Sequence, residues 1–470
     1  MLRVIIILFI SYLFISSCER IDSSSDSKLL FSEDTLYFDT VFTSIGSVTK
    51  ELRIMNPGKH DLIINHVYLS GGSSSQFRLN IDGEPVNEKY NIQIESGDSI
   101  YIFVDVFVDP GNSNSPVAVT DSIIFSFGET NLKVRLLAWG QDIHLIKSRT
   151  ISSETWNKGK PYVVYEKVLV DTLESLTIEE GTRIFFHRNA SMVIAESIIV
   201  NGSAESPVLF AGDRLEKMFE DIPGQWKGIL ILNSAKANNV SHAIIRNAIY
   251  GIQVGEAITS NEVPVLKLFS SVISHSTISG LSAINGNVEA ANCIFAHCGN
   301  YCIYLEAGGD YTFTNCTLFN TWEYGMRLTP ALLLTEKPEN PEVRVNKLEV
   351  NLNNSVVYGD IKTELNIIPF NELFTGKYYF DHCLIKLDTL IASFWDKNEF
   401  PGTIINKTPL FIDAARWDLR PDTLSPLINN GSPDFSAIYP IDIRGVSRIL
   451  NGNPDIGAFE RLPGEHKNEK

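Results

Sequence analysis

A short internal repeat is the feature that most constrains the fold of this chain. Four segments align on Gly251, Gly280, Cys302 and Gly325, which follow one another at intervals of 29, 22 and 23 residues. Nine positions before these anchors the aligned column reads His242, Ser271, Cys293 and Cys316. A period of about 20–30 residues that keeps small and apolar positions in register is typical of a solenoid.

The repeated segments are predicted to be strands. Their apolar runs are short and rich in β-branched residues, and none shows a helical stripe. A coil of short strands and tight turns suits a parallel β-helix, in which each rung buries its inward side chains on the next. Residues 353–359 and 381–387 continue the pattern, whereas 329–347 reads as a loop leaving one rung. The column predicted to point inward is Ser271, Cys293, Cys316, Ser355 and Cys383.

Polar residues precede this inward column by one position. They are Ser241, Ser270, Asn292, Asn315, Asn354 and His382. Stacked amide side chains can bond from rung to rung and satisfy backbone groups in turns. We therefore expect a structural role for them.

The N-terminus predicts an envelope location. A basic start and a short apolar run make residues 1–17 a signal peptide, too short to span a bilayer. Ile15-Ser16-Ser17-Cys18 resembles the bacterial lipobox, which implies that Cys18 is lipidated. The alternative is an ordinary signal peptide with an incidental cysteine. Residues 18–28 read as a flexible tether, and the lipid would anchor the protein to a membrane, extracytoplasmically, at the outer membrane or cell surface.

Charge and cysteine content exclude several classes of protein. The formal net charge of −17 argues against nucleic acid as a partner. Apart from Cys18, the five cysteines lie at rung spacing within the repeats, which is not a disulfide framework. A bridge between Cys293 and Cys316 is an open alternative. Cys298 and Cys302 have no second ligand pair nearby, so no metal site is predicted.

Residues 29–142 form a separate first domain. Seven short strand-like runs are separated by turn signals such as NPGK (56–59) and DPGNSNSP (109–116), as in a β-sandwich. The order of strands and turns resembles the Ig-like domains of the hydin and major-sperm-protein type. This resemblance implies a packing or binding module without catalytic residues.

Residues 143–461 are predicted to form a second domain, of which about 150–461 resembles a second family. SLTIEEGTRIFF (175–186), GQWKGILI (224–231) and the closing IDIRGVSRILNGNPDIGAFE (441–460) are similar to the right-handed parallel β-helix lipoproteins of Bacteroidetes-type bacteria. The resemblance implies an all-β chain: an Ig-like β-sandwich, then a right-handed parallel β-helix with a C-terminal cap. Residues 462–470 are predicted to be a disordered tail. The resemblance implies no particular reaction.

One column offers a candidate ligand site. Arg246, His275, His297 and Asn320 fall four positions after the inward column and are expected to point outward. With Tyr301 or Trp322 as a stacking platform, such a row would suit an anionic glycan. These residues can also be read as ordinary polar neighbours of turns, and the aromatic residues as covers for the ends of rungs.

The predicted function is binding or display of glycans by a non-catalytic, lipid-anchored protein. The carboxylates of the repeats fall in no common column, so no glycosidase pair is evident, and the motifs of β-helix enzymes do not occur. The alternative is a polysaccharide lyase or hydrolase of an acidic glycan. A lyase would use Arg246 as base and could require Ca²⁺; no other cofactor is expected.

Overall fold

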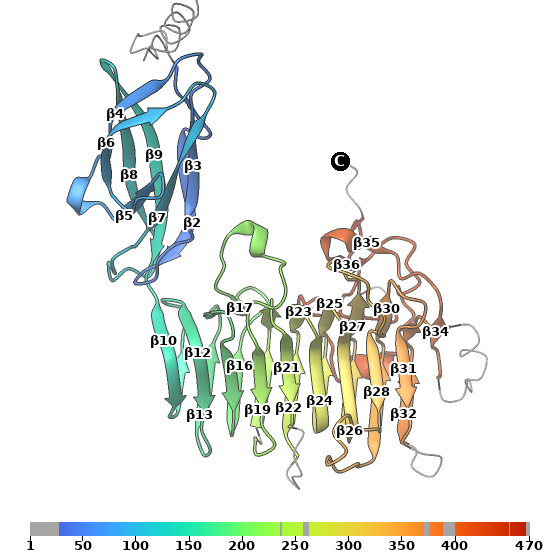
Figure 1. Cartoon of the computed structure of the whole chain (residues 1–470). Helices are drawn as coiled ribbons and strands as arrows, with labels where there is room; N and C mark the ends of the chain where they lie inside the picture. Colours follow the sequence, from blue (N-terminus) through green and yellow to red (C-terminus); the bar gives the residue numbers. More distant parts are fainter. Residues whose placement is uncertain are drawn as a thin grey trace, which may run out of the picture. The chain divides into compact units, whose positions relative to one another are not determined.

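The computed structural model is built almost entirely of strands (Figure 1). It describes residues 28–235, 237–256, 263–370, 376–388, 400–450 and 452–466. Two compact units divide the chain, Met1–Ile143 and His144–Lys470. The predicted all-β fold class is confirmed.

The first unit is a sandwich of two sheets. The four-stranded sheet has the order β1-β3-β7-β5, and the five-stranded sheet has the order β2-β9-β8-β4-β6. One buried cluster takes side chains from both sheets, including Ile54 of β3 and Val134 of β9. The resemblance to Ig-like domains stays a prediction. The bounds are β1 Leu30–Phe31, β2 Thr35–Phe42, β3 Lys50–Met55, β4 Leu62–Leu69, β5 Phe77–Ile81, β6 Glu88–Ile94, β7 Ser99–Val106, β8 Val117–Phe127 and β9 Thr130–Gln141.

The second unit is a parallel β-helix, as predicted. Strands of successive rungs pair in parallel and form three faces, while β10 (His144–Ile151) covers the start by pairing with β12. The first face holds β11 (Glu154–Trp156), β13 (Ser175–Glu179), β16 (Ser197–Asn201), β19 (Ala237–Ser241), β22 (Val265–Phe269), the ends of β24 (Ser279–Ala291) and β26 (Tyr301–Thr314), β29 (Leu348–Asn353) and β32 (Lys377–Asp381).

The other two faces complete each rung. The second face holds the start of β12 (Tyr162–Val170), β14 (Arg183–Phe186), β17 (Val208–Gly212), β20 (Ala243–Arg246), β23 (Val272–Ser276), β25 (Ile294–Cys298), β27 (Thr317–Asn320), β30 (Val356–Gly359), β33 (Leu384–Ile385) and β34 (Ile404–Ile405). The third holds the end of β12, β15 (Ser191–Ile194), β18 (Gly228–Ile231), β21 (Tyr250–Val254), the starts of β24 and β26, β28 (Leu332–Thr335) and β31 (Leu365–Ile368).

The predicted inward column is confirmed. Its side chains are fully buried at Ser271, Cys293, Cys316, Ser355 and Cys383. The five cysteines that the structure describes are all free and buried, so Cys293 and Cys316 form no disulfide.

The glycine alignment placed His242 in line with this column, which was wrong. Ile244 pairs with Val272, which places Ala243 rather than His242 in line with Ser271. Tyr250 pairs with Ser279. The stretch from Val272 to Ser279 is therefore one residue longer than the paired stretch from Ile244 to Tyr250. Alignment on the glycines therefore gave the correct register between these two rungs on the third face, but a register that is wrong by one residue on the second face.

The same shift moves the first member of the polar column from Ser241 to His242. All members of the corrected column have a left-handed backbone, with φ between 45° and 55°: His242, Ser270, Asn292, Asn315, Asn354 and His382. Asparagine tolerates this conformation better than most residues, which explains its frequency here. We call this the left-handed column.

A third difference concerns the loop after β27. Ile303 pairs with Leu332, so Ala331 rather than Gly325 lies opposite Cys302. The loop covers 321–331, and β28 occupies part of the predicted insert 329–347. The sequence analysis thus treated the first part of this long loop, up to Gly325, as part of a regular rung.

The C-terminal segment 409–466, here called the cap segment, packs against the second face. Leu419 and Ala458 bury the outer surfaces of Ile294, Ala296 and Phe319. The cap segment contains η3 (Ala414–Arg416), the antiparallel pair β35 (Phe411–Asp413) and β36 (Asp418–Pro421), and α3 (Pro433–Ser436).

The sequence predicted a lipidated N-terminus and a disordered C-terminal tail. The signal peptide, Cys18 and the tether up to residue 27 lie outside the described residues. No helix within the described ranges is long and apolar enough to cross a membrane. In the predicted tail, Glu465 accepts hydrogen bonds from Arg420 and Arg444, so residues 462–466 belong to the cap segment.

Candidate functional site

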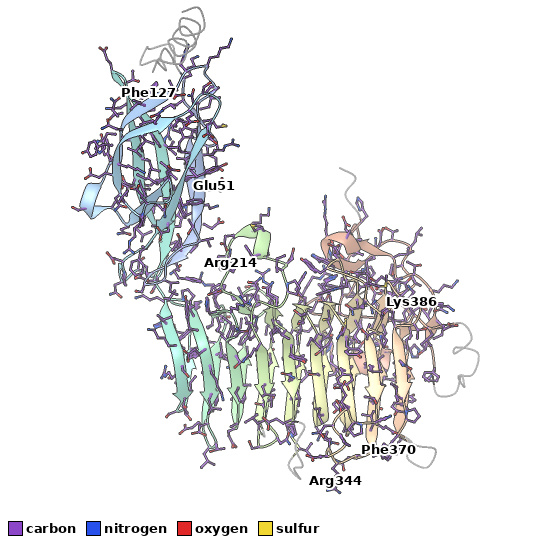
Figure 2. The ribbon with its side chains drawn as sticks, viewed as in Figure 1. Glu51, Phe127, Arg214, Arg344, Phe370 and Lys386 are labelled. Atoms are coloured by element: carbon purple, nitrogen blue, oxygen red, sulfur yellow. The ribbon has the colours of Figure 1, made fainter. Side chains whose placement is uncertain are left out.

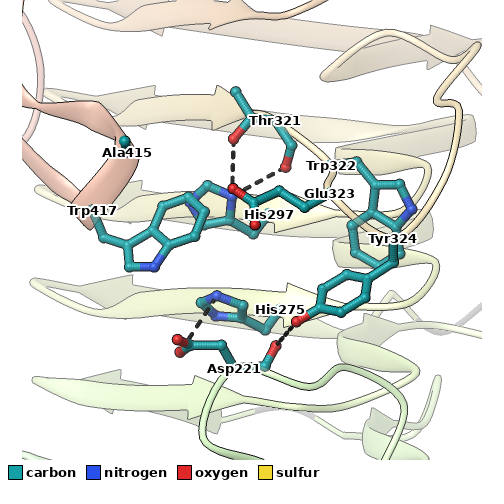
Figure 3. A pocket seen from close by; sticks show the side chains of 9 residues that line it. All are labelled: Asp221, His275, His297, Thr321, Trp322, Glu323, Tyr324, Ala415 and Trp417. Carbon is teal, nitrogen blue, oxygen red and sulfur yellow. Dashed lines mark hydrogen bonds and ion pairs between the residues drawn. The ribbon is translucent and has the colours of Figure 1, made fainter. Parts of the chain in front are cut away.

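A cleft of about 210 Å³ opens on the second face where three distant segments meet (Figure 3). Two rungs form its floor, and the loops after β17 and β27 and the cap segment form its walls. We call it the cleft. It is lined by Asp221, His275, His297, Thr321, Trp322, Glu323, Tyr324, Ala415 and Trp417.

Two histidines on successive rungs form the floor. His275 in β23 and His297 in β25 both have a left-handed backbone, with φ of 52° and 54°. Parallel pairing of the flanking residues sets them side by side, with ring centroids 5.1 Å apart. Their residues are only 6% and 3% exposed, because the cap segment and the loops cover them.

Burial keeps both imidazoles neutral. Desolvation, helped by the neighbouring His275, lowers the pKa of His297 to about 2. Desolvation also lowers the pKa of His275, against the opposing charge of Asp221. At neutral pH the floor of the cleft is therefore polar but uncharged.

The tautomer of His297 follows from its contacts. Its Nδ1 lies 3.1 Å from the backbone oxygen of Thr321, and a carbonyl can only accept, so Nδ1 carries the proton. Nε2 is then a bare acceptor. It is buried and has no hydrogen-bond partner among the described residues.

The loop after β17 is braced so that it holds Asp221 over the floor. The guanidinium of Arg214, labelled in Figure 2, lies 3.8 Å from the ring centroid of Phe219. The amide of Asn247 donates to the backbone oxygens of Glu220 and Ile222, both at 2.9 Å. The carboxylate of Asp221 comes within 3.7 Å of His275 Nε2.

Aromatic side chains line the walls. Trp322 and Tyr324 contact each other edge to face at 5.2 Å, and the Tyr324 hydroxyl donates to the backbone oxygen of Asp221 at 3.2 Å. Trp417 of the cap segment lies edge-on to His275, with ring centroids 5.3 Å apart, and packs on His297 (Figure 3). The cleft thus combines apolar ring surfaces with acceptors at its floor and rim.

Three of the predicted site residues meet in this cleft, namely His275, His297 and Trp322. The two histidines do share a column, but they are buried rather than pointing freely outward. The expectation of an open polar row is corrected: the cap segment, whose docking the repeats do not reveal, covers these rungs.

Arg246 is not part of that column. It pairs with Ser274, so its neighbour Asn247 falls opposite His275. Its guanidinium binds Glu220 at 3.1 Å instead of lining the cleft. The one-residue slip of the first rung explains this error.

Tyr301 and Asn320 also lie elsewhere. Tyr301 packs on Tyr304, with ring centroids 5.1 Å apart, and does not line the cleft. Asn320 is buried and accepts a hydrogen bond from the Cys298 backbone at 2.8 Å, which is a structural role.

Six lining residues were not among the predicted site residues, namely Asp221, Thr321, Glu323, Tyr324, Ala415 and Trp417. Each lies outside the repeated positions, and Trp417 comes from the cap segment. The only signal was the cluster of aromatic and acidic residues in 321–324 next to the predicted Trp322.

A metal site is not evident. Within the described ranges, no group of three or more His, Cys, Asp or Glu residues is placed to hold an ion. We assign no role to Ca²⁺.

Comparison with protein families agrees with the strand pairing. Residues 227–378 match the family model described as "Right handed beta helix region", and residues 148–261 match that of the "Pectate-lyase like beta helix domain". The second unit is a right-handed β-helix. The predicted handedness is therefore confirmed, whereas the matches leave the lipoprotein resemblance untested.

Comparisons with curated proteins and with solved structures indicate no function for this chain. No curated protein matches the chain significantly. A structure of a family 123 glycoside hydrolase from Clostridium perfringens is 8% identical and covers 24% of this chain and 25% of its own, with a TM-score of 0.18. A PapD-like domain of human CEP192 is 13% identical and covers 27% of this chain and 96% of its own, with a TM-score of 0.17. The chain thus spans about a quarter of the hydrolase, and both likenesses are too weak to indicate a shared function.

Proposed function

We propose that the protein binds a glycan in the cleft of its right-handed β-helix. The observation that carries this proposal is that three aromatic side chains, Trp322, Tyr324 and Trp417, line the same cleft as His297, whose Nε2 has no partner among the described residues. Sugar rings present apolar C–H surfaces to aromatic rings and hydroxyl donors to buried acceptors. A pocket with apolar walls and a few converging polar groups is the usual form of a ligand site.

The size of the cleft indicates how much of a glycan it holds. About 210 Å³ is less than the roughly 300–1,000 Å³ of sites for drug-sized ligands. The cleft therefore accommodates about one sugar unit, at the end or at a branch of a glycan, rather than a long stretch of chain.

The cell envelope is the proposed location. The support is the apolar run that ends in Ile15-Ser16-Ser17-Cys18, where Cys18 would carry the lipid. The sandwich, 29–142, would then stand between the anchor and the β-helix in the order of the chain.

A carbohydrate-active enzyme is the second candidate. It is favoured by Asp221 and Glu323, two carboxylates that line the same cleft, because carboxylates are the groups that glycosidases use. A lyase with Arg246 as base has less support, since Arg246 is engaged by Glu220. Release of reducing ends from a bound glycan, absent from the double variant Asp221→Asn/Glu323→Gln, would establish the enzyme.

A glycan-array screen tests binding. The wild-type chain should retain a defined set of glycans, and Trp417→Ala should weaken that retention at least tenfold. Trp139→Ala is the matched control, because Trp139 is 45% exposed on the sandwich and lies outside the cleft. Equal retention by wild type and Trp417→Ala would contradict the proposal.

A further inference from the structure

The cleft is lined by acidic residues and by no basic ones among the described residues, histidines aside. Its lining contains the carboxylates of Asp221 and Glu323, and none of the described residues that line it is a lysine or arginine. Two basic residues close to the lining residues pair with other carboxylates. Arg246 binds Glu220 at 3.1 Å, and Arg416 of the cap segment is 77% exposed and faces Asp413 at 4.0 Å.

The floor does not neutralise these two carboxylates. His275 faces Asp221 across 3.7 Å, but burial holds its imidazole in the uncharged form. Both carboxylates act on the same part of the cleft: besides burial, Asp221 and Glu323 each raise the pKa of the Tyr324 hydroxyl. Their negative fields overlap beside that side chain.

The aromatic walls, like the two carboxylates, favour a positively charged ligand. The face of an indole or phenol ring carries partial negative charge and attracts cations, most strongly for tryptophan. Trp322, Tyr324 and Trp417 supply three such rings in the cleft that holds the two carboxylates. Carboxylates and aromatic faces together select against an anionic ligand.

The buried Nε2 of His297 is the third acceptor. His297 is 3% exposed, its Nδ1 donates to Thr321, and its Nε2 lacks a partner among the described residues. An unsatisfied buried acceptor costs free energy until a donor reaches it. A ligand that brings a donor would remove this cost.

We propose that the ligand is a sugar with a free, protonated amine, and that Asp221, Glu323 and the Nε2 of His297 receive its ammonium group. This inference rests on the proposed function that the cleft binds a glycan, and it names the class of sugar. A primary ammonium has three donors and a unit positive charge. The cleft offers two anionic acceptors and one neutral acceptor, with aromatic rings for the sugar face. The expected preference for an anionic glycan is thereby reversed.

Calorimetry on the full chain, at a pH where the sugar amine is protonated, tests this inference. Three probes of equal length are compared: glucosamine oligomers, N-acetylglucosamine oligomers and oligogalacturonate. The glucosamine oligomers should bind at least tenfold more tightly than the acetylated oligomers, and added salt should reduce this preference because screening weakens charge pairs.

The variant Asp221→Asn/Glu323→Gln identifies the groups responsible. Both changes keep shape, and the side chain of Asp221 is 53% exposed, so the fold should survive. The variant should bind glucosamine and N-acetylglucosamine oligomers with equal affinity. Glu166→Gln, which removes an exposed carboxylate from β12 far along the solenoid, should keep the wild-type preference.

The outcomes separate the two proposals. Equal or stronger binding of the acetylated or acidic oligomers by wild type would overturn the amine inference and leave glycan binding intact. An amine preference that persists in the double variant would also overturn it. No binding of any of the three probes, together with an empty glycan array, would overturn both.

Discussion

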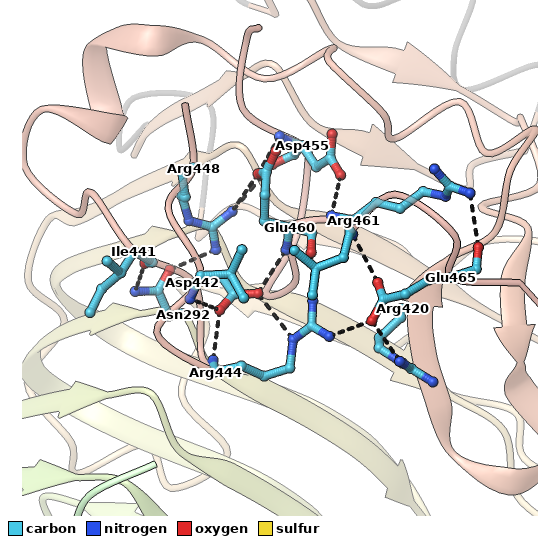
Figure 4. Close-up of polar contacts among 12 residues, drawn as sticks. Asn292, Arg420, Ile441, Asp442, Arg444, Arg448, Asp455, Glu460, Arg461 and Glu465 are labelled. Atoms are coloured by element: carbon cyan, nitrogen blue, oxygen red, sulfur yellow. Dashed lines mark hydrogen bonds and ion pairs between the residues drawn. The ribbon is translucent and has the colours of Figure 1, made fainter. Parts of the chain in front are cut away.

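Arg448 and Asn292 lie 156 residues apart in the chain, yet Arg448 Nη2 donates a hydrogen bond to Asn292 Oδ1 at 2.7 Å (Figure 4). The amide of Asn292 in turn donates to the backbone oxygen of Ile441 at 3.0 Å. The left-handed column, predicted to bond from rung to rung, therefore binds the cap segment here. That segment carries Trp417 to the cleft, so cap docking and the proposed site are coupled.

Arg448 should be essential for cap docking. It is fully buried beside the buried carboxylates of Asp442, Asp455 and Glu460. Removal of one partner from a buried charge network leaves the others uncompensated, which typically costs about 3–5 kcal/mol. We expect Arg448→Met to lower the free energy of unfolding by about that amount in urea titrations.

Arg416→Ala is the control for Arg448→Met. Arg416 lies in the same segment but is 77% exposed, so its removal should cost less than about 0.5 kcal/mol. Equal losses for the two variants would refute the role assigned to Arg448.

Two members of the left-handed column should differ in importance. Asn354 Nδ2 donates to the Ser432 oxygen at 3.0 Å, and its Oδ1 accepts from the Ser432 backbone N–H at 2.7 Å. Both polar side-chain atoms of Asn315 are buried without a partner among the described residues. Since glycine accepts the same positive φ, Asn354→Gly should destabilise by roughly 2 kcal/mol more than Asn315→Gly. Thermal unfolding of the two variants checks this, and an inverted order would contradict it.

His297 should make stability fall in acid. Its pKa is about 2 in the folded chain, against 6.5 for a solvent-exposed histidine, so below pH 6.5 the unfolded chain takes up a proton that the folded chain does not. The stability that this residue contributes is thus complete above pH 6.5 and is lost as the pH falls. His297→Asn keeps a residue suited to positive φ and removes the titration. The free energy of unfolding of the wild type, relative to that of the variant, should fall by roughly 2 kcal/mol from pH 7 to pH 5. A difference between the two proteins that does not change with pH would contradict the burial of this imidazole.

Cys18 should anchor the protein. Replacement of Cys18 by Ser removes the proposed lipid attachment site, so the protein should move from the detergent-extracted membrane fraction to the soluble extracytoplasmic fraction. Ser17→Ala, which keeps a small residue before the cysteine, should leave the distribution unchanged. Retention of Cys18→Ser in membranes at the wild-type level would exclude lipid anchoring.

The sequence predicted features that repeat and missed those that do not. Inward positions such as Cys293 and Cys316 hold small residues on successive rungs, and asparagine recurs where the backbone is left-handed. These constraints are local, so the period shows them. The slip at Arg246 arose because one rung has an extra residue in a turn, and glycine anchors cannot detect a change in turn length upstream of them.

The candidate site was only partly predictable for a related reason. His275 and His297 share a column, so their adjacency follows from the period. Trp417 reaches them through a segment that docks by contacts such as that between Arg448 and Asn292. Pairs so far apart in sequence leave no periodic signal, and the burial of the histidines under the cap segment could not be foreseen.

The most direct test of glycan binding is a crystal structure of the full chain with the tightest ligand from the array. We predict one sugar unit in the cleft, its ring against Trp417 or Trp322 and a donor within hydrogen-bond distance of His297 Nε2. A glycan bound elsewhere, with the cleft empty at saturating ligand, would contradict the central claim.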